Sequence, residues 1–253
     1  MSEVLYTRRD VLKLSAGAVL GITIAGCGER TQEKAQTPEV TKSTEKYPEH
    51  QVIATIFYIG EQASASNAGI DNVSTAWEND ATKQFGGVDD PENRNQRGLP
   101  ADFTPKENPF YVALPASEFD KNGLIAGARA SSPWVDEISL LQFDESLFKG
   151  RWVEVKNPQT GEAVYGQWVD TGPSADPKGA RDYEYVFGDA SVTPKNDFGL
   201  KAGIDVSPAM AHHLGFDIAI GGIEVVWRFV DPQDIPDGPW KEFPPIDNKT
   251  HWN

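Results

Sequence analysis

The sequence predicts a mainly β domain, a closed barrel with long loop insertions and a short helix near 207–215. Two observations support this prediction. Runs of aromatic and β-branched residues, which favour strands, recur from residue 51 onward. Long stretches with no clear period, residues 60–109 and 171–202, lie between them. Hydrophobic residues make up 39% of the 253-residue chain, which is enough to build a real core.

The first two predicted strands stand on either side of the first long loop. Residues 52–59 form an apolar, β-branched run that contains one Phe and one Tyr. Residues 110–114 form a second apolar run, which Pro115 ends.

A β-hairpin is predicted over residues 151–169. Residues 151–156 alternate polar and apolar side chains, which is the period of a half-buried strand. The sequence Asn-Pro-Gln-Thr-Gly at 157–161 is a turn by composition. Residues 163–169 then return as the partner strand.

A short helix and a final strand are predicted in the last fifth of the chain. Ser207 is a good N-cap, Pro208 suits the first helical position and Gly215 stops the helix. Residues 223–230 read as the last strand of the barrel.

The N-terminus has the pattern of an export signal. Arg8 and Arg9 precede a mostly Ala, Val, Leu, Ile and Gly run that is too short for a good membrane-spanning helix. Paired arginines indicate the twin-arginine route. Ile-Ala-Gly-Cys at 24–27 resembles a bacterial lipobox, whose cysteine, here Cys27, receives the lipid. We therefore expect residues 1–26 to be a signal peptide and the mature protein to be a lipoprotein on the outer face of a membrane.

Composition divides the mature chain into three parts. Residues 27–49 are rich in Glu, Lys, Thr, Gln and Pro, so we expect a disordered tether. Residues 50–232 hold the predicted barrel, and residues 233–253 are expected to be a C-terminal tail.

Charge and cysteine content exclude several classes of partner and bond. The formal net charge is −15; residues 1–26 hold three basic and two acidic side chains, so the chain without them carries −16. A surface this acidic repels phosphate backbones, which argues against nucleic acid as a partner. The single cysteine allows no intrachain disulfide.

Two aspartates are the candidate chemical groups. The chain has no phosphate-binding Gly-rich loop and no Gly-x-Ser-x-Gly motif, and we expect no cofactor and no metal. Asp170 follows a predicted strand and Asp205 precedes the predicted helix, each among apolar or small neighbours. A carboxyl at the mouth of a barrel can serve as a general acid, and paired carboxylates cut glycosidic bonds. The alternative is structural: Asp170 binding turn amides and Asp205 helping to cap the helix.

Three segments resemble the double-psi β-barrel of rare lipoprotein A (RlpA-like) proteins, to which expansins and family 45 glycoside hydrolases look related. The segments are Val-Asp-Thr-Gly-Pro at 169–173, the Ile-Asp-Val-Ser motif with its helix at 204–215, and Val-Val-Trp-Arg-Phe at 225–229. The resemblance implies a six-stranded barrel whose groove binds polysaccharide. It also implies that Asp170 is a catalytic acid of a lytic transglycosylase and that Asp205 matches the important Asp of expansins and family 45 hydrolases.

Aromatic side chains are the expected sugar-stacking groups of such a groove. The candidates are Trp77, Tyr111 and Trp168, with Trp134 and Trp152 as further aromatics. At most two of the tryptophans are expected to face a groove, because aromatic residues in barrels more often build the core.

Three functions remain open at this point, and the residues do not decide whether the protein is an enzyme. It could cut cell-wall or extracellular polysaccharide such as peptidoglycan with Asp170 as general acid/base. It could bind or loosen the glycan without catalysis, as an expansin-like module. It could also be a scaffold that binds another envelope protein. Thr171 and Ser174 stand where RlpA-like enzymes usually carry Arg and a basic or His residue, which weakens the catalytic reading.

The lipobox predicts that cells expressing the full chain attach labelled palmitate to it. A Cys27→Ala variant should incorporate none, because the acylated sulfur is gone. Metabolic labelling followed by immunoprecipitation measures both. Equal label in the variant and the wild type would contradict the lipoprotein prediction.

Overall fold

We describe the fold from a computed structural model of the chain. The structure describes residues 46–63, 71–173, 181–196, 199–217 and 220–252. The chain divides into two units, Met1–Lys46 and Tyr47–Asn253. The predicted signal peptide 1–26, the lipidation site Cys27 and most of the tether 27–49 lie outside the described residues. Within those residues, no helix has the length and apolar character needed to cross a membrane.

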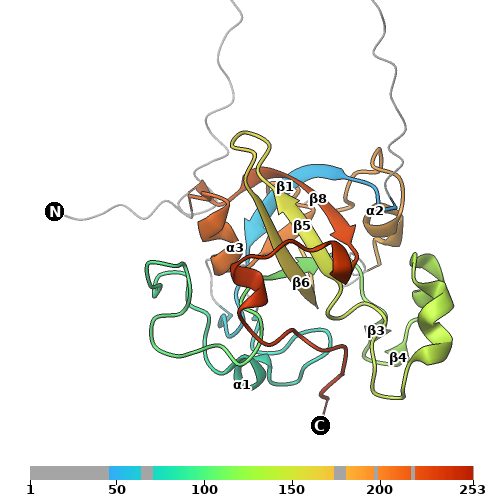
Figure 1. The fold of residues 1–253 in the computed structure, drawn as a ribbon. Helices are drawn as coiled ribbons and strands as arrows, with labels where there is room; N and C mark the ends of the chain where they lie inside the picture. Colours follow the sequence, from blue (N-terminus) through green and yellow to red (C-terminus); the bar gives the residue numbers. More distant parts are fainter. Residues whose placement is uncertain (1–45, 64–70, 174–180, 197–198, 218–219, 253) are drawn as a thin grey trace, which may run out of the picture. The chain divides into compact units, whose positions relative to one another are not determined.

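Six strands close into a barrel in the order β1-β7-β2-β6-β5-β8 (Figure 1). The predicted fold class, a mainly β six-stranded barrel with a short helix near 207–215, is therefore confirmed. The strands are β1 (His50–Ile56), β2 (Tyr111–Leu114), β5 (Trp152–Lys156), β6 (Ala163–Thr171), β7 (Ile204–Val206) and β8 (Ile223–Val230).

Two parallel pairs give the barrel its topology. β1 runs parallel to β7 and β2 parallel to β6, and the antiparallel pair β2–β7 lies between them. Parallel neighbours require long crossover connections, so long loops are a requirement of this topology. β7 is the strand that the sequence pattern did not predict, because three residues are too few to show a period.

The predicted hairpin is confirmed. β5 pairs antiparallel with β6 over Trp152–Lys156, with Val153 opposite Gly166 and Val155 opposite Val164. The valines are buried in the main core, while Glu154 between them is half-buried. β5 and β1 both pair with β8, and these pairs close the barrel.

The predicted helix is α3 (Pro208–His213), and Ser207 links it to the barrel. The Ser207 hydroxyl oxygen accepts a hydrogen bond from the Met210 amide at 3.2 Å, and the hydroxyl donates to the Pro109 carbonyl at 2.8 Å. Gly215 follows the helix with φ at 69°, a left-handed conformation that favours glycine. One hydroxyl therefore caps the helix and fixes it to the start of β2.

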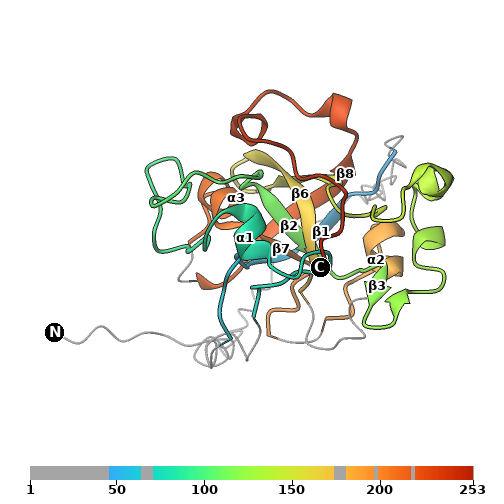
Figure 2. The same cartoon turned by 90° about the horizontal axis from the view of Figure 1, so that it is seen from below.

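Short elements lie in the connections between the barrel strands and after the last strand, and α1 and α2 interrupt the two predicted loops. They were not predicted because six residues or fewer carry no readable period. In Figures 1 and 2, α1 and α3 lie on one side of the barrel, and α2 lies on the other with β3 and β4. The short elements are β3 (Phe119–Asp120), β4 (Gly123–Leu124), α1 (Ala81–Phe85), α2 (Tyr183–Phe187), and the 3-10 turns Arg129–Ser131, Val135–Leu140, Pro232–Asp234 and Pro239–Lys241.

The structure moves both boundaries of the predicted domain. Tyr47, assigned to the tether, is buried and donates a hydrogen bond from its hydroxyl to Asp231 at 2.8 Å. The described part of the segment assigned to a tail, residues 233–252, packs on the barrel. Trp240 lies on Tyr165, and the Ile246 amide donates to the Gln167 side chain at 2.9 Å. Both segments carry apolar side chains whose burial stabilises the barrel.

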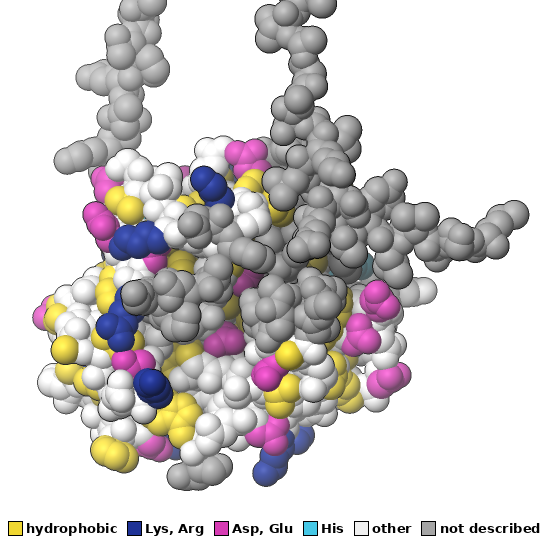
Figure 3. All heavy atoms as spheres, turned by 180° about the vertical axis from the view of Figure 1, so that it is seen from behind, with side chains coloured by type: hydrophobic (Ala, Val, Ile, Leu, Met, Phe, Trp, Pro, Cys, Tyr) yellow, Lys and Arg dark blue, Asp and Glu magenta, His cyan; other side chains and the backbone are white. Residues whose placement is uncertain are grey.

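Acidic side chains are spread over the face seen in Figure 3, where Lys and Arg are interspersed among them. The excess negative charge of the chain therefore does not collect in one patch of the described residues on this face.

His50 is a buried titratable group at the start of β1. Its side chain is 1% exposed and stacks on Trp227 with 4.6 Å between ring centroids, and neither ring nitrogen has a hydrogen-bond partner among the described residues. Burial lowers the pKa of His50 to about 4, and the charge of Asp189 opposes the shift in part.

We predict that acid destabilises the domain through His50. The unfolded chain binds a proton at His50 near pH 6.5 and the folded chain near pH 4, so the stabilisation is present above pH 6.5 and is lost as the pH falls toward 4. A His50→Phe variant has no such group to protonate. As the pH falls from 6.5 to 4, the difference in unfolding free energy, variant minus wild type, should therefore increase by up to ~3 kcal/mol.

Urea unfolding at several pH values measures the difference between the two proteins. Other titrating groups are common to both and cancel. A His212→Gln variant, altered at an exposed histidine, should follow the wild type. A His50→Phe difference that stays constant with pH would refute the prediction.

Candidate functional site

A bulge in β6 turns Asp170 to the outside of the barrel. Val112 of β2 pairs with Trp168, and the next residue, Ala113, pairs with Asp170, so Val169 is an extra residue in β6. Trp168 packs in the main core, while Ala113 and Val169 belong to a second apolar cluster. In a regular strand Asp170 would share the face of Trp168. Because the extra residue shifts the alternation, Asp170 lies on the face of Ala113 instead.

Asp205 reaches the same face from the other side of β2. It lies in β7 between Ile204 and Val206, both of which pack in the main core, so its side chain points outward. Its partner across the β2–β7 pair is Ala113. Asp170 and Asp205 therefore flank one alanine, each about 5 Å away across a strand pair. We call Asp170, Ala113 and Asp205 the carboxylate site.

Asp170 is held by backbone amides and is nearly closed off from solvent. Its Oδ1 accepts hydrogen bonds from the amides of Ala76 at 2.8 Å and Thr171 at 2.7 Å, and the residue is 9% exposed. Burial raises the pKa of Asp170 to about 7; the two amide hydrogen bonds oppose the shift, and the charge of Asp205 adds to it. Because both amides donate to Oδ1, Oδ2 is the oxygen free to take up a proton, and the protonated form, about half of the molecules at pH 7, can donate a hydrogen bond.

Asp205 is oriented by its neighbours on both sides. The hydroxyl of Thr55, its partner in the β1–β7 pair, donates a hydrogen bond to Asp205 Oδ1. On the other side, a Cβ placed on Gly172 would lie 3.0 Å from Asp205 Oδ2. Glycine therefore leaves room for the carboxylate beside the chain that carries Asp170. The predicted structural role of Asp205 as a helix cap is wrong, because Ser207 caps α3.

A buried ion pair supports the loop over Asp170. Lys149 is 3% exposed and pairs with Glu78, and its ammonium group also donates to the Lys249 carbonyl at 2.6 Å. His251 lies 2.9 Å from the same Glu78 carboxylate, and its amide donates to the Trp77 carbonyl at 2.8 Å. The C-terminal segment thus holds residues 77–78, next to the Ala76 amide that binds Asp170. Nothing local in the sequence signals this support.

The predicted sugar-stacking residues lie in the core. Trp77, Tyr111 and Trp168 are each 0% exposed, and Trp134 is 5% exposed. Trp77 packs edge-on against Trp168 with 5.8 Å between ring centroids. A sugar cannot reach a ring that core side chains cover, so we correct their assignment from the site to the core. Trp152 is half-buried and also packs against the main core.

Tyr111 instead fixes a loop to the barrel. Its hydroxyl donates to Asp89 at 2.7 Å and accepts from the Ile59 amide at 3.1 Å. Asp89 is fully buried and pairs with Arg94. A buried carboxylate is tolerated when it is paired and hydrogen-bonded in this way.

The described residues contain no cluster of three metal-ligating side chains. Within them, the adjacent rings of His212 and His213 lie edge to face, 5.4 Å apart.

Comparison with protein-family models gives no match, and comparison with curated proteins gives none either. Among solved structures, cerato-platanin 3 from M. perniciosa is similar over 72% of this chain and 94% of its own, with 12% identity and a TM-score of 0.32. This similarity is too low to support an argument about function, which is inferred from the geometry of the carboxylate site instead.

We predict that Asp170 titrates near pH 7 and that its pKa falls in an Asp205→Asn variant. Removal of the neighbouring charge takes away one cause of the shift, while burial, the largest cause, keeps the pKa above its ordinary value. Carboxyl-carbon NMR measures both titrations.

A Glu162→Gln variant, altered at an exposed position in the β5–β6 turn, is the matched control and should leave the titration unchanged. Titration of Asp170 near pH 4 in the wild type would contradict the assigned environment.

Proposed function

We propose that this domain binds polysaccharide at the carboxylate site as a non-catalytic, expansin-like module. The observation that supports this is the pairing of two carboxyl groups with different hydrogen-bonding roles around a small residue. Asp170, with its pKa raised to about 7, can donate in its protonated form, while Asp205 accepts. Sugar hydroxyls both donate and accept, so such a pair complements a glycan chain. Ala113 itself is only 2% exposed, so the glycan would meet the site at Asp205, which is half-buried.

The surroundings of Asp170 favour binding over cutting. A general acid must come within hydrogen-bond reach of the glycosidic oxygen, about 2.6–3.2 Å. Asp170 is only 9% exposed and is held by the Ala76 and Thr171 amides. RlpA-like enzymes usually carry an Arg and a basic or His residue at two positions near this Asp. This chain has Thr171 and Ser174 at those positions.

A second candidate is a lytic transglycosylase or glycosidase. The observation that favours it is the pKa of Asp170, because a group that titrates near the working pH is a good general acid/base. Asp205 would assist it. A transglycosylase of this kind needs only one acid/base, whereas a hydrolase needs two carboxyl groups at a set separation.

The sequence supports a proposal for the location and the glycan. The signal peptide would direct export and be removed, lipid on Cys27 would anchor the domain to the outer face of a membrane, and residues 28–46 would space it from the surface. Its ligand would then be a wall or extracellular polysaccharide. A chain with net charge −16 after removal of the signal repels anionic polymers, so a weakly charged or neutral glycan is the better partner.

Binding is tested by sedimentation of the purified domain, residues 47–253, with insoluble peptidoglycan, chitin and cellulose. The wild type should be retained on at least one of them. Asp205→Ala should lower the retained affinity by about tenfold, the effect of losing a hydrogen bond to a charged group. Glu162→Gln serves as the control. A wild type that none of the three retains would refute the proposal.

Asp170→Asn separates the two candidates. Asn keeps an oxygen that accepts from the two amides and an NH₂ group that donates where Asp170 Oδ2 carries its proton. A binding module should therefore retain its affinity within about twofold, while Asp170→Leu should lose it. Soluble sugars released by the wild type but not by Asp170→Asn, detected by mass spectrometry, would establish the enzyme instead.

A further inference from the structure

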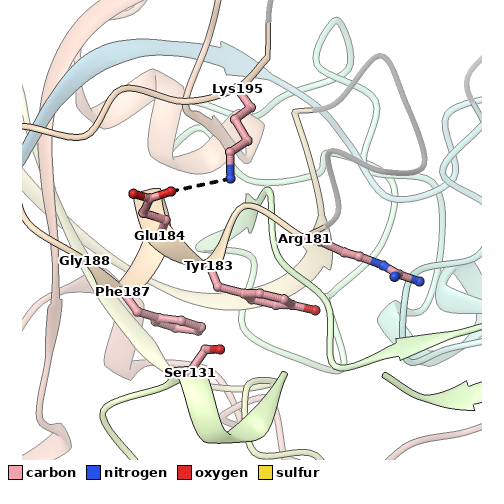
Figure 4. Close-up of a pocket in the computed structure, with 7 residues that line it drawn as sticks. All are labelled: Ser131, Arg181, Tyr183, Glu184, Phe187, Gly188 and Lys195. Carbon is pink, nitrogen blue, oxygen red and sulfur yellow. Dashed lines mark ion pairs between the residues drawn. The ribbon is translucent and has the colours of Figure 1, made fainter. Parts of the chain in front are cut away.

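A pocket opens beside α2, away from the carboxylate site's own residues. Its volume is about 420 Å³, within the range of small-molecule sites. Figure 4 shows the rings of Tyr183 and Phe187 side by side on α2, with the Ser131 hydroxyl facing them. The lining residues are Ser131, Arg181, Tyr183, Glu184, Phe187, Gly188 and Lys195.

The two rings form a rigid pair of parallel aromatic faces. They are parallel within 1°, with centroids 6.4 Å apart. Phe187 packs against Phe148 at 5.1 Å and Trp134 at 5.8 Å, which fixes it to the core. The Tyr183 hydroxyl donates to the Ser117 carbonyl at 2.7 Å, which fixes the second ring. Because neither ring needs to be ordered on binding, a ligand that stacks on them loses little free energy to that ordering.

The charged groups around the pocket, two basic and three acidic, are all held in ion pairs. Lys195 lies 3.2 Å from Asp182 and 3.9 Å from Glu184. Arg181 lies 2.8 Å from Asp120. An anionic ligand would have to displace these carboxylates, and a cationic ligand would have to displace the two basic groups. An uncharged ligand with many hydroxyls can use the same groups as hydrogen-bond partners without breaking the pairs.

The pocket and the carboxylate site share one end of β2. Arg181 forms an isolated bridge with Ala116, and the Asp182 amide donates to the Pro115 carbonyl at 2.9 Å. Ala116 is three residues beyond Ala113, and the chain bends between them at Pro115. The segment that follows β2 therefore connects the carboxylate site to the chain that lines the pocket.

We infer that this pocket is a second subsite, which stacks an uncharged sugar unit of the same glycan on Tyr183 and Phe187. This inference rests on the proposed function and adds to it the ligand class, a neutral polysaccharide, and the residues that hold a further sugar unit.

The test blocks the pocket without touching the carboxylate site. Ser131 is exposed and lines the pocket, so Ser131→Trp is designed to fill the pocket with a large side chain. Ser131→Ala is the control, because it also removes the hydroxyl but adds no bulk. Tyr183→Leu removes a ring, while Tyr183→Phe removes only its hydroxyl. Binding of cellohexaose, chitohexaose and hexagalacturonate is measured by calorimetry on the 47–253 domain, with thermal unfolding as the check on folding.

Ser131→Trp and Tyr183→Leu should each weaken binding of a neutral hexaose about five- to tenfold relative to Ser131→Ala and Tyr183→Phe. If Ser131→Trp binds as tightly as Ser131→Ala, and Tyr183→Leu as tightly as Tyr183→Phe, the pocket is not a subsite. If, in addition, Asp205→Ala is the variant that loses binding, the proposed function still holds. Tighter binding of hexagalacturonate than of both neutral hexaoses would overturn the ligand class. Absence of wild-type binding to every soluble and insoluble glycan would overturn both proposals.

Discussion

The double pairing of Ala113 is the constraint on which the site depends. β2 has only four residues, all buried, yet it holds β6 on one side and β7 on the other. One alanine in this strand therefore fixes the positions of two aspartates that are 35 positions apart in the chain. The bulge at Val112–Ala113 is the second part of this constraint, because without the extra residue Asp170 would face the core.

Burying Asp170 requires support from distant parts of the chain. The Ala76 amide that binds it sits in a segment held by the Lys149–Glu78 ion pair and by His251. Lys149 and Glu78 are themselves buried, so each would be destabilising without the other. The last residues of the chain thus belong to the same structural unit as the candidate site, which explains why they are packed rather than extended.

The aromatic residues divide into two groups with different physical roles. Those that the sequence made prominent, such as Trp77 and Trp168, fill the core and stack on one another. Two that are partly exposed, Tyr183 and Phe187, sit on a five-residue helix in a loop. Phe187 joins the two groups because its ring lies against the core and also lines the pocket. A surface ring supported in this way is rigid, which suits recognition of another rigid ring.

The sequence by itself determined the elements whose signals are local. Alternation in residues 151–156 predicts a half-buried strand, and Ser207 with Pro208 predicts a helix start, because both depend on neighbours within a few positions. It also singled out Asp170 and Asp205 as residues of interest. Only the tertiary structure decided that they flank Ala113, that Trp77 and Trp168 are buried, and that residues 233–253 belong to the domain. Those outcomes depend on pairings between segments far apart in the chain and on one bulge, and neither leaves a periodic pattern in the sequence.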